Sequence, residues 1–148
     1  SAPFFDRPAL RFLTGVYIQS DVSDNLPAVL ADSVQIQQVI LNLLLNARDA
    51  TEKLTDRSPV IHVVASFDNG FVYVAVSDNG IGIANKSLDT IFEPYFTTRE
   101  KGMGLGLAIS RTIVETHGGR ITAQKVDPHG TRITFSLPVS RARTTNAS

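Results

Sequence analysis

Two glycine-marked segments carry the residue types that bind nucleotides. The first, Asp78-Asn79-Gly80-Ile81-Gly82-Ile83, ends an apolar run, and the second, Lys101-Gly102-Met103-Gly104-Leu105-Gly106-Leu107, opens into a helical pattern. A glycine-rich start to a helix leaves backbone N–H groups free to bind phosphate. A carboxylate that ends an apolar strand can accept a hydrogen bond from a base. Together the two segments predict a nucleotide-binding site.

A polar stripe interrupts a leucine-rich helical segment at helical spacing. Gln38, Asn42, Asn46 and Asp49 follow one another at steps of four, four and three residues, so they share one face. The stripe is either the solvated face of an amphipathic helix or a half-buried face that lines a cavity. Asparagine oxygens are neutral, hard ligands that suit Mg²⁺. The stripe alone leaves both interpretations open.

Simpler interpretations of the glycines also exist. Asn79-Gly80 could be a hairpin turn, and the later glycines could form a flexible linker. Their spacing matches neither the GxxxxGK[ST] loop nor the GxGxxG fingerprint, because position 107 is leucine. Arg99 and Lys101 precede the glycines, where they could meet outer phosphates or remain solvated.

The elements that must position these residues follow from periodicity and turn signals. Asp32 and Gln35 form a capping-box pattern at the start of the leucine-rich helix. The pattern predicts a strand over 16–22, a helix from 33 to about 54, a hairpin of 60–67 with 71–77, a helix over 104–117 and a hairpin of 120–126 with 131–137. Hairpins covered by helices on one face predict an α/β two-layer sandwich with a mixed sheet.

Composition fits one domain over residues 1–148 with an ordinary apolar core. Hydrophobic residues make up 43% of the chain, there are no cysteines, and 14 basic residues balance 14 acidic ones. A net charge of zero gives no reason to expect nucleic acid as a partner. No apolar run could cross a bilayer and no signal peptide is evident, so we expect a cytoplasmic location. Membrane anchoring of the parent protein is left undecided. The polar residues 140–148 are expected to form a disordered tail.

Five sequence blocks occur in an order that is highly specific. Read together, they resemble the catalytic, ATP-binding domain of sensor histidine kinases, of the nitrogen- and oxygen-sensing type, within the superfamily of gyrase, the Hsp90 chaperone and MutL. The blocks resemble the N box (38–47), the G1 box (78–82), the F box (91–98), the G2 box (102–108) and a final glycine motif (130–131).

The resemblance implies a fold and a set of site residues. It implies a Bergerat-type fold with a core of about 26–138, in which a mixed five-stranded sheet backs about three helices and residues 84–103 form a long mobile ATP lid. It makes Asn42 and Asn46 the catalytic residues, with Asn46 also the Mg²⁺ ligand. The residues it implies for binding ATP are Asn46, Asp78, Gly80, Gly82, Ile83, Thr98, Arg99, Gly102, Met103, Gly104, Leu105, Gly106, Leu107 and Thr131.

The resemblance also implies an activity and partners. Hydrolysing relatives place a glutamate where Asn42 stands, and an amide cannot act as a general base near neutral pH. None of the three histidines precedes an acidic residue, as the family's phosphoacceptor does. The chain would therefore hold Mg²⁺-ATP and pass its γ-phosphoryl group to a histidine on a separate, dimerising domain, with a response regulator downstream. The isolated domain is expected to be monomeric.

One departure keeps other functions open. Asp49 stands where many of these kinases carry a phosphate-contacting lysine, and a carboxylate would repel phosphate. Arg48 or Arg99 could supply the missing charge. The alternatives are an ATP-hydrolysing conformational switch and a degenerate, non-catalytic binding module.

Overall fold

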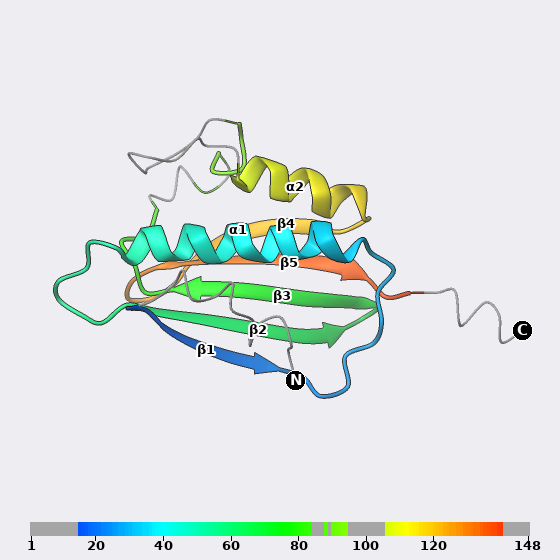
Figure 1. The fold of residues 1–148 in the computed structure, drawn as a ribbon, viewed down its shortest axis with the longest axis horizontal. Helices are drawn as coiled ribbons and strands as arrows, with labels where there is room; N and C mark the ends of the chain where they lie inside the picture. The colour runs from blue at the N-terminus through cyan, green and yellow to red at the C-terminus, as the bar shows by residue number, and fades with distance from the viewer. Residues whose placement is uncertain (1–14, 84–87, 89, 95–105, 141–148) are drawn as a thin grey trace, which may run out of the picture.

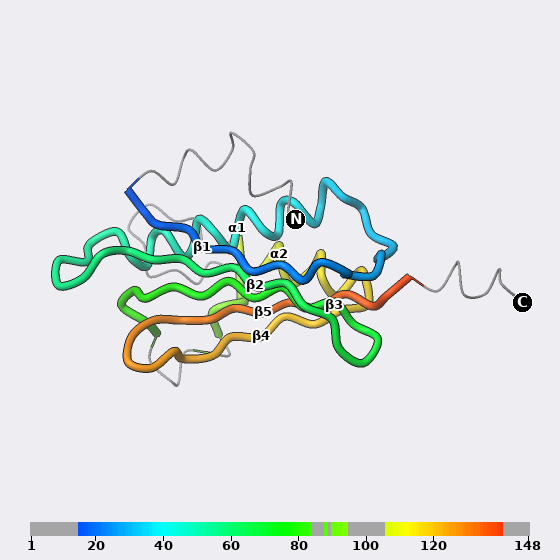
Figure 2. Tube along the Cα trace, turned by 90° about the horizontal axis from the view of Figure 1, so that it is seen from below, coloured from blue at the N-terminus to red at the C-terminus, as the bar shows by residue number. Residues whose placement is uncertain are grey.

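A five-stranded mixed sheet forms one layer of the protein. The structure, a computed structural model, describes residues 15–83, 88, 90–94 and 106–140. The strands lie side by side in the order β1-β2-β3-β5-β4, with β1 parallel to β2 and the other neighbours antiparallel (Figure 2). In chain order the elements are β1 (Tyr17–Val22), α1 (Ser33–Thr51), β2 (Val60–Asp68), β3 (Phe71–Asp78), α2 (Gly106–Thr116), β4 (Arg120–Lys125) and β5 (Thr131–Pro138) (Figure 1).

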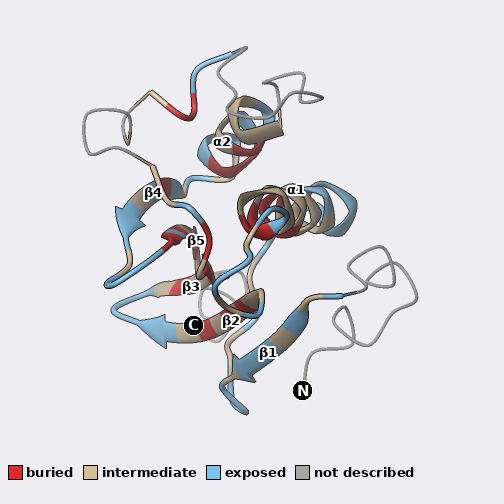
Figure 3. Ribbon diagram, turned by 90° about the vertical axis from the view of Figure 1, so that its left-hand side faces the viewer, coloured by how far each residue is buried: buried red, intermediate tan, exposed pale blue. Residues whose placement is uncertain are grey.

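Both helices cover the same face of the sheet (Figure 3). Alternate strand residues such as Ile61, Val63 and Phe135 are buried there and form one core cluster with Leu43 and Leu44 of α1. Burying each of these side chains contributes roughly 1.5–3 kcal/mol. The predicted two-layer α/β sandwich with a mixed five-stranded sheet is therefore confirmed. β1 extends this sheet ahead of the expected core of 26–138.

The β2–β3 hairpin turns where the sequence predicts it. Asn69 and Gly70 both have positive φ, at 52° and 86°, as a two-residue type I′ turn requires. The register continues directly from the turn, with Asp68 opposite Phe71. Asn79-Gly80, by contrast, is followed by residues 81–83, which form no strand, so it is not a second hairpin turn.

The first helix is shorter than predicted, and the predicted start of the second, at 104–105, lies outside the described residues. α1 ends at Thr51 rather than near Leu54, because the N–H of Ile81 donates to the Ala50 carbonyl at 3.1 Å and takes the place of a further helical turn. The described residues contain two helices where the resemblance implied about three. Of the intervening segment, residues 88 and 90–94 lie in turns and bends rather than a helix. No helix within the described residues is long and apolar enough to cross a membrane.

The predicted capping box is half right. The Asp32 carboxylate accepts from the N–H groups of Val34 and Gln35 at 3.0 and 3.1 Å, as expected of an N-cap. The Asp32 N–H, however, donates to Nε2 of His117 at 3.1 Å rather than to Gln35. Since Nε2 accepts, the proton sits on Nδ1, which donates to the Ile113 carbonyl at 2.7 Å. His117 is thus a neutral, structural link between the start of α1 and the end of α2.

Candidate functional site

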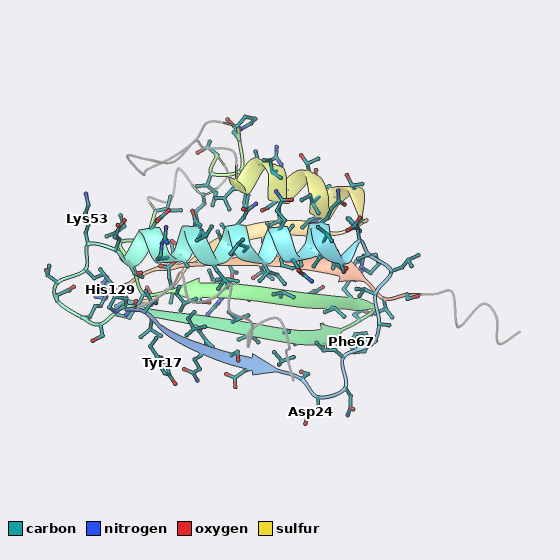
Figure 4. All side chains as sticks on the ribbon, in the orientation of Figure 1. Tyr17, Asp24, Lys53, Phe67 and His129 are labelled. Atoms are coloured by element: carbon teal, nitrogen blue, oxygen red, sulfur yellow. The ribbon has the colours of Figure 1, made fainter. Side chains whose placement is uncertain are left out.

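The predicted site residues that the structure describes gather at one end of the molecule. The C-terminal half of α1 carries Asn42 and Asn46, β3 ends in Asp78, α2 begins at Gly106, and β5 begins at Thr131 (Figure 1). Side chains of the connections there, Lys53 after α1 and His129 before β5, lie at this same end (Figure 4). Elements far apart in sequence therefore meet at one edge of the fold.

Asp78 is a buried carboxylate that no cation neutralises among the described residues. Its Oδ1 accepts from the Gly80 N–H at 2.8 Å, and its carboxylate also accepts from the backbone N–H of Thr131. Burial raises the pKa of Asp78 to about 6, although these two hydrogen bonds act in the opposite direction. Such a carboxylate is costly to keep, which marks it as a candidate functional group.

Asn42 joins the polar stripe of α1 to the glycine-led start of α2. Its Nδ2 donates to the Gly106 carbonyl at 3.1 Å and to Oγ of Ser110 at 3.2 Å. Ser110 is fully buried, so this contact lies inside the helix–helix packing. The leucine-rich helix therefore faces Gly106, where the described part of the second glycine segment begins, as a shared nucleotide site requires.

Asn46 lies one turn further along α1 and is half-buried. None of the described residues forms a hydrogen bond with its side chain, so its amide oxygen remains available to a ligand. Gln38, at the far end of the stripe, is exposed. The stripe is therefore solvated at one end and half-buried at the other, and a hard oxygen donor such as Asn46 fits Mg²⁺.

Asp49, which stands where many related kinases carry lysine, has a neighbouring cation. NH2 of Arg48 donates to Oδ1 of Asp49 at 3.3 Å, and both side chains are partly buried at 38% and 17% exposure. The arginine thus partly offsets the acidic charge that stands where many relatives have lysine. Arg99, the other candidate cation, lies outside the described residues.

The glycines of the first segment serve the protein's own packing. A Cβ on Gly80 would lie 2.3 Å from the Ala50 carbonyl oxygen, so the close approach that requires glycine here is to α1. Gly82 has a φ of 76° and its Cβ position lies 3.5 Å from the carbonyl oxygen of Gly130. Ile83 and Leu107 are half-buried and pack against the core cluster.

Several predicted site residues fall outside the described part of the chain. They are Thr98, Arg99, Gly102, Met103, Gly104 and Leu105, together with most of the expected lid over 84–103. From the F box, Ile91 and Phe92 are described and are buried in the core cluster at 1% and 5% exposure.

Sequence reasoning missed four residues that build the site. The hydroxyl of Ser110 accepts a hydrogen bond from Asn42, and Gly130 packs closely against the backbone of Asp78. Arg57 and Asn79 form hydrogen bonds that hold the first glycine segment in place. Gly130 and Asn79 stand out in the sequence only as members of motifs, and nothing there marks Arg57. No spacing rule links Arg57 to Asn79 and Gly80, because they meet only when β2 and β3 pair.

Known proteins share both the sequence and the fold. Residues 31–141 match the family described as "Histidine kinase-, DNA gyrase B-, and HSP90-like ATPase". The chain belongs to this family. Within it, this ATPase domain is 42% identical to sensor histidine kinase ZraS of Escherichia coli (strain K12), over 86% of the chain and 27% of ZraS. The domain therefore spans about a quarter of that relative's length.

Solved structures place the domain with the sensor histidine kinases. The catalytic domain of histidine kinase ThkA superposes with a TM-score of 0.74 at 31% identity, covering 88% of this chain and 84% of that one. ThkA has also been solved in complex with the response regulator protein TrrA, with a TM-score of 0.71 at 30% identity over 89% and 36% of the two chains. Full-length ShkA in complex with AMPPNP gives a TM-score of 0.75 at 31% identity, covering 90% of this chain and 27% of ShkA. The domain is thus a histidine kinase ATPase domain, as its five sequence blocks predicted.

Proposed function

We propose that this domain binds Mg²⁺-ATP and supplies its γ-phosphoryl group for autophosphorylation of a histidine on a separate, dimerising domain of a two-component sensor kinase. The observation that carries the proposal is the pair of hydrogen bonds from Asn42 to the first turn of α2. They bring the half-buried amide of Asn46 and the start of α2 to the end of the fold where Asp78 is buried.

Asp78 is the group that recognises adenine. An ionised carboxylate accepts from the exocyclic amine of adenine, and its protein hydrogen bonds from Gly80 and Thr131 fix its orientation beforehand. Such preorganisation avoids an ordering cost at the moment of binding.

Asn46 and the start of α2 serve the phosphates. Mg²⁺ retains several waters and shares substrate phosphates, so one amide oxygen from Asn46 is a suitable protein ligand. The first N–H groups of a helix lack helical partners and attract anions, and α2 begins at Gly106 within the described residues. The similarity to ShkA, solved in complex with AMPPNP, supports an adenine nucleotide as the ligand.

The chemistry and hydrogen bonds of Asn42 favour phosphoryl transfer over hydrolysis. Its amide NH2 group is committed to Gly106 and Ser110, and an amide is no base for activating water. The domain contributes positioning and charge neutralisation, which make up most of what phosphoryl transfer requires.

Two of the histidines, His62 and His117, have structural partners. His62 bonds Asp21 across β1 and β2 at 2.7 Å, and His117 ties the two helices together. Since none of the three histidines, the exposed His129 included, precedes an acidic residue, we place the acceptor histidine on another domain of the parent kinase. The similarity to ThkA, solved with TrrA, supports a response regulator as the next partner. We assign the domain to the cytoplasmic part of that parent and expect it to be monomeric in isolation.

Calorimetry on Asn46→Ala tests the metal assignment. The variant should bind Mg²⁺-ATP about tenfold or more weakly, since metal ligation is lost, while its affinity for Mg²⁺-free adenosine stays unchanged. Gln38→Ala, on the exposed end of the same stripe, is the matched control and should alter neither affinity. Equal losses for both ligands would show that Asn46 does not serve the metal.

Transfer is tested by mixing the domain with the dimerising domain of its parent and labelled ATP. Label on a histidine of the added domain supports a kinase. Steady release of labelled phosphate by the domain alone, abolished by Asp78→Ala, would instead support an ATP-hydrolysing switch. Nucleotide binding with neither outcome would favour a non-catalytic binding module.

A further inference from the structure

The connection between α1 and β2 lies against the first glycine segment. Arg57, in this connection, donates from Nε to the Asn79 carbonyl at 2.7 Å and from NH2 to the Gly80 carbonyl at 3.0 Å. Its NH1 donates to both carboxylate oxygens of Asp56 at 2.9 and 2.7 Å. All three guanidinium nitrogens are therefore engaged, and the side chain is only 21% exposed.

The two carbonyls that Arg57 holds belong to consecutive peptide groups. In a trans peptide the C=O and N–H point in opposite directions. The N–H paired with the Asn79 carbonyl is that of Gly80, which donates to Oδ1 of Asp78 at 2.8 Å. The N–H paired with the Gly80 carbonyl is that of Ile81, which donates to the Ala50 carbonyl at 3.1 Å. Each peptide group is thus hydrogen-bonded through both its N–H and its C=O, and Arg57 binds the C=O in each case.

Asn79 holds the segment from the other direction. Its Oδ1 accepts from the Val60 N–H at 2.9 Å, and its Nδ2 donates to the Ser58 carbonyl at 2.8 Å. Two residues that closely follow Arg57, Ser58 and Val60, are therefore fixed to the first glycine segment. The guanidinium cannot drift without breaking several hydrogen bonds at once.

We propose that Arg57 is a positioning residue for adenine recognition, because it sets the peptide that aims the Gly80 N–H at the Asp78 carboxylate. The proposal rests on the function proposed above and adds a residue to it. Arginine suits this task because its rigid fork binds two neighbouring oxygens at fixed spacing, which a lysine ammonium cannot do. The cation also polarises the peptide and strengthens the N–H donor on its far side.

The test compares Arg57→Ala and Arg57→Lys with Asp56→Ala. Asp56 pairs with Arg57 but touches neither peptide, so Asp56→Ala is the matched control. Arg57→Ala should weaken adenosine and Mg²⁺-ATP by the same factor, about fivefold to tenfold, because charge-assisted hydrogen bonds on the adenine side are lost. Arg57→Lys should recover only part of this loss, and Asp56→Ala should bind as the wild type does.

A second readout needs no nucleotide. Amide hydrogen exchange at Gly80 and Ile81 should accelerate about tenfold in Arg57→Ala and remain at the wild-type rate in Asp56→Ala. Unchanged exchange at both amides in a folded variant would overturn the proposal even if the domain binds no ATP. Loss of Mg²⁺-ATP affinity alone would also overturn it, because Arg57 would then act at the phosphates. If Arg57→Ala does not fold, Arg57→Lys decides by the same two measurements.

Discussion

The two ends of the proposed ATP site are built in different ways. At the adenine end, Arg57 donates hydrogen bonds to the backbone between Asp78 and Ile81, and N–H groups of that backbone donate to the Asp78 carboxylate and to the last turn of α1. At the phosphate end, within the described residues, Asn42 is the side chain that hydrogen-bonds α1 to the start of α2. At the adenine end, hydrogen bonds to several elements fix the backbone. At the phosphate end, the described contact joins two helices.

The difference matches what each end has to bind. Adenine is rigid and keeps one pattern of donors and acceptors, so a prebuilt carboxylate gains affinity by avoiding ordering costs. The phosphate chain changes its charge and length in the reaction, and Mg²⁺ brings its own waters. Among the described residues, that end offers a helix start and an amide oxygen. Changes at the adenine end should therefore affect fold and binding together.

Gly80→Ala should give the largest effect. The added Cβ would lie 2.3 Å from the Ala50 carbonyl oxygen, and both partners are backbone that cannot rotate away. Overpacking of this kind costs about 1–3 kcal/mol or more, and the shifted peptide would no longer donate to Asp78. Chemical denaturation and adenosine binding measure the two losses.

Gly70→Ala is the control for Gly80→Ala. Gly70 has a positive φ in the β2–β3 turn but open space around its Cβ position. It should cost roughly 1 kcal/mol through backbone strain and leave adenosine affinity unchanged. If Gly80→Ala were as stable as the wild type, the last turn of α1 must move to make room for the added Cβ. The adenine end would then not be the more rigid of the two ends.

Asp78→Asn should separate stability from binding. Losing a charge-assisted hydrogen bond to adenine should weaken adenosine and ATP by about tenfold to a hundredfold. Removing a buried, uncompensated charge should leave the fold as stable at neutral pH or up to about 3 kcal/mol more stable. Calorimetry and thermal melts give the two values, and a folded variant with wild-type affinity would remove Asp78 from the site.

The pH dependence of the wild type follows from the same group. The pKa of Asp78 is about 6 in the fold against 3.8 for an ordinary aspartate, so the folded state binds more protons between these values. This group's contribution to stability is therefore greatest below pH 3.8 and is lost as the pH rises through about 6. Adenosine binding runs the other way and should weaken as the pH falls through about 6. Asp78→Asn should show neither trend.

Ser110→Ala should give the smallest effect and confine it to the phosphate end. It removes one of the two acceptors of Asn42 and should cost about 1 kcal/mol, with a few-fold loss of Mg²⁺-ATP affinity. Adenosine should bind as before. Thr112→Ala, whose exposed hydroxyl bonds the Ala108 carbonyl of the same helix, is the control. An equal loss of adenosine affinity in Ser110→Ala would mean that the two ends are coupled.

Local sequence rules predicted the frame of the fold well. Alternation gave the strands, Asn69-Gly70 gave its turn, and Asp32 gave the start of α1. The rules failed where a distant residue replaced a local partner. Ile81 takes the carbonyl of Ala50 and ends α1 early, and His117 takes the N–H of Asp32 in place of Gln35.

The sequence by itself determined the chemistry available to this domain: a carboxylate after a strand, two amides one turn apart and glycines leading into a helix. These are properties of residue type and spacing. Only the tertiary structure decided which groups work together, because Asn42 meets Ser110 through helix packing and Arg57 reaches the Asn79 and Gly80 carbonyls through strand pairing. Hydrogen bonds between distant residues depend on where whole elements pack, and no short stretch of sequence records that.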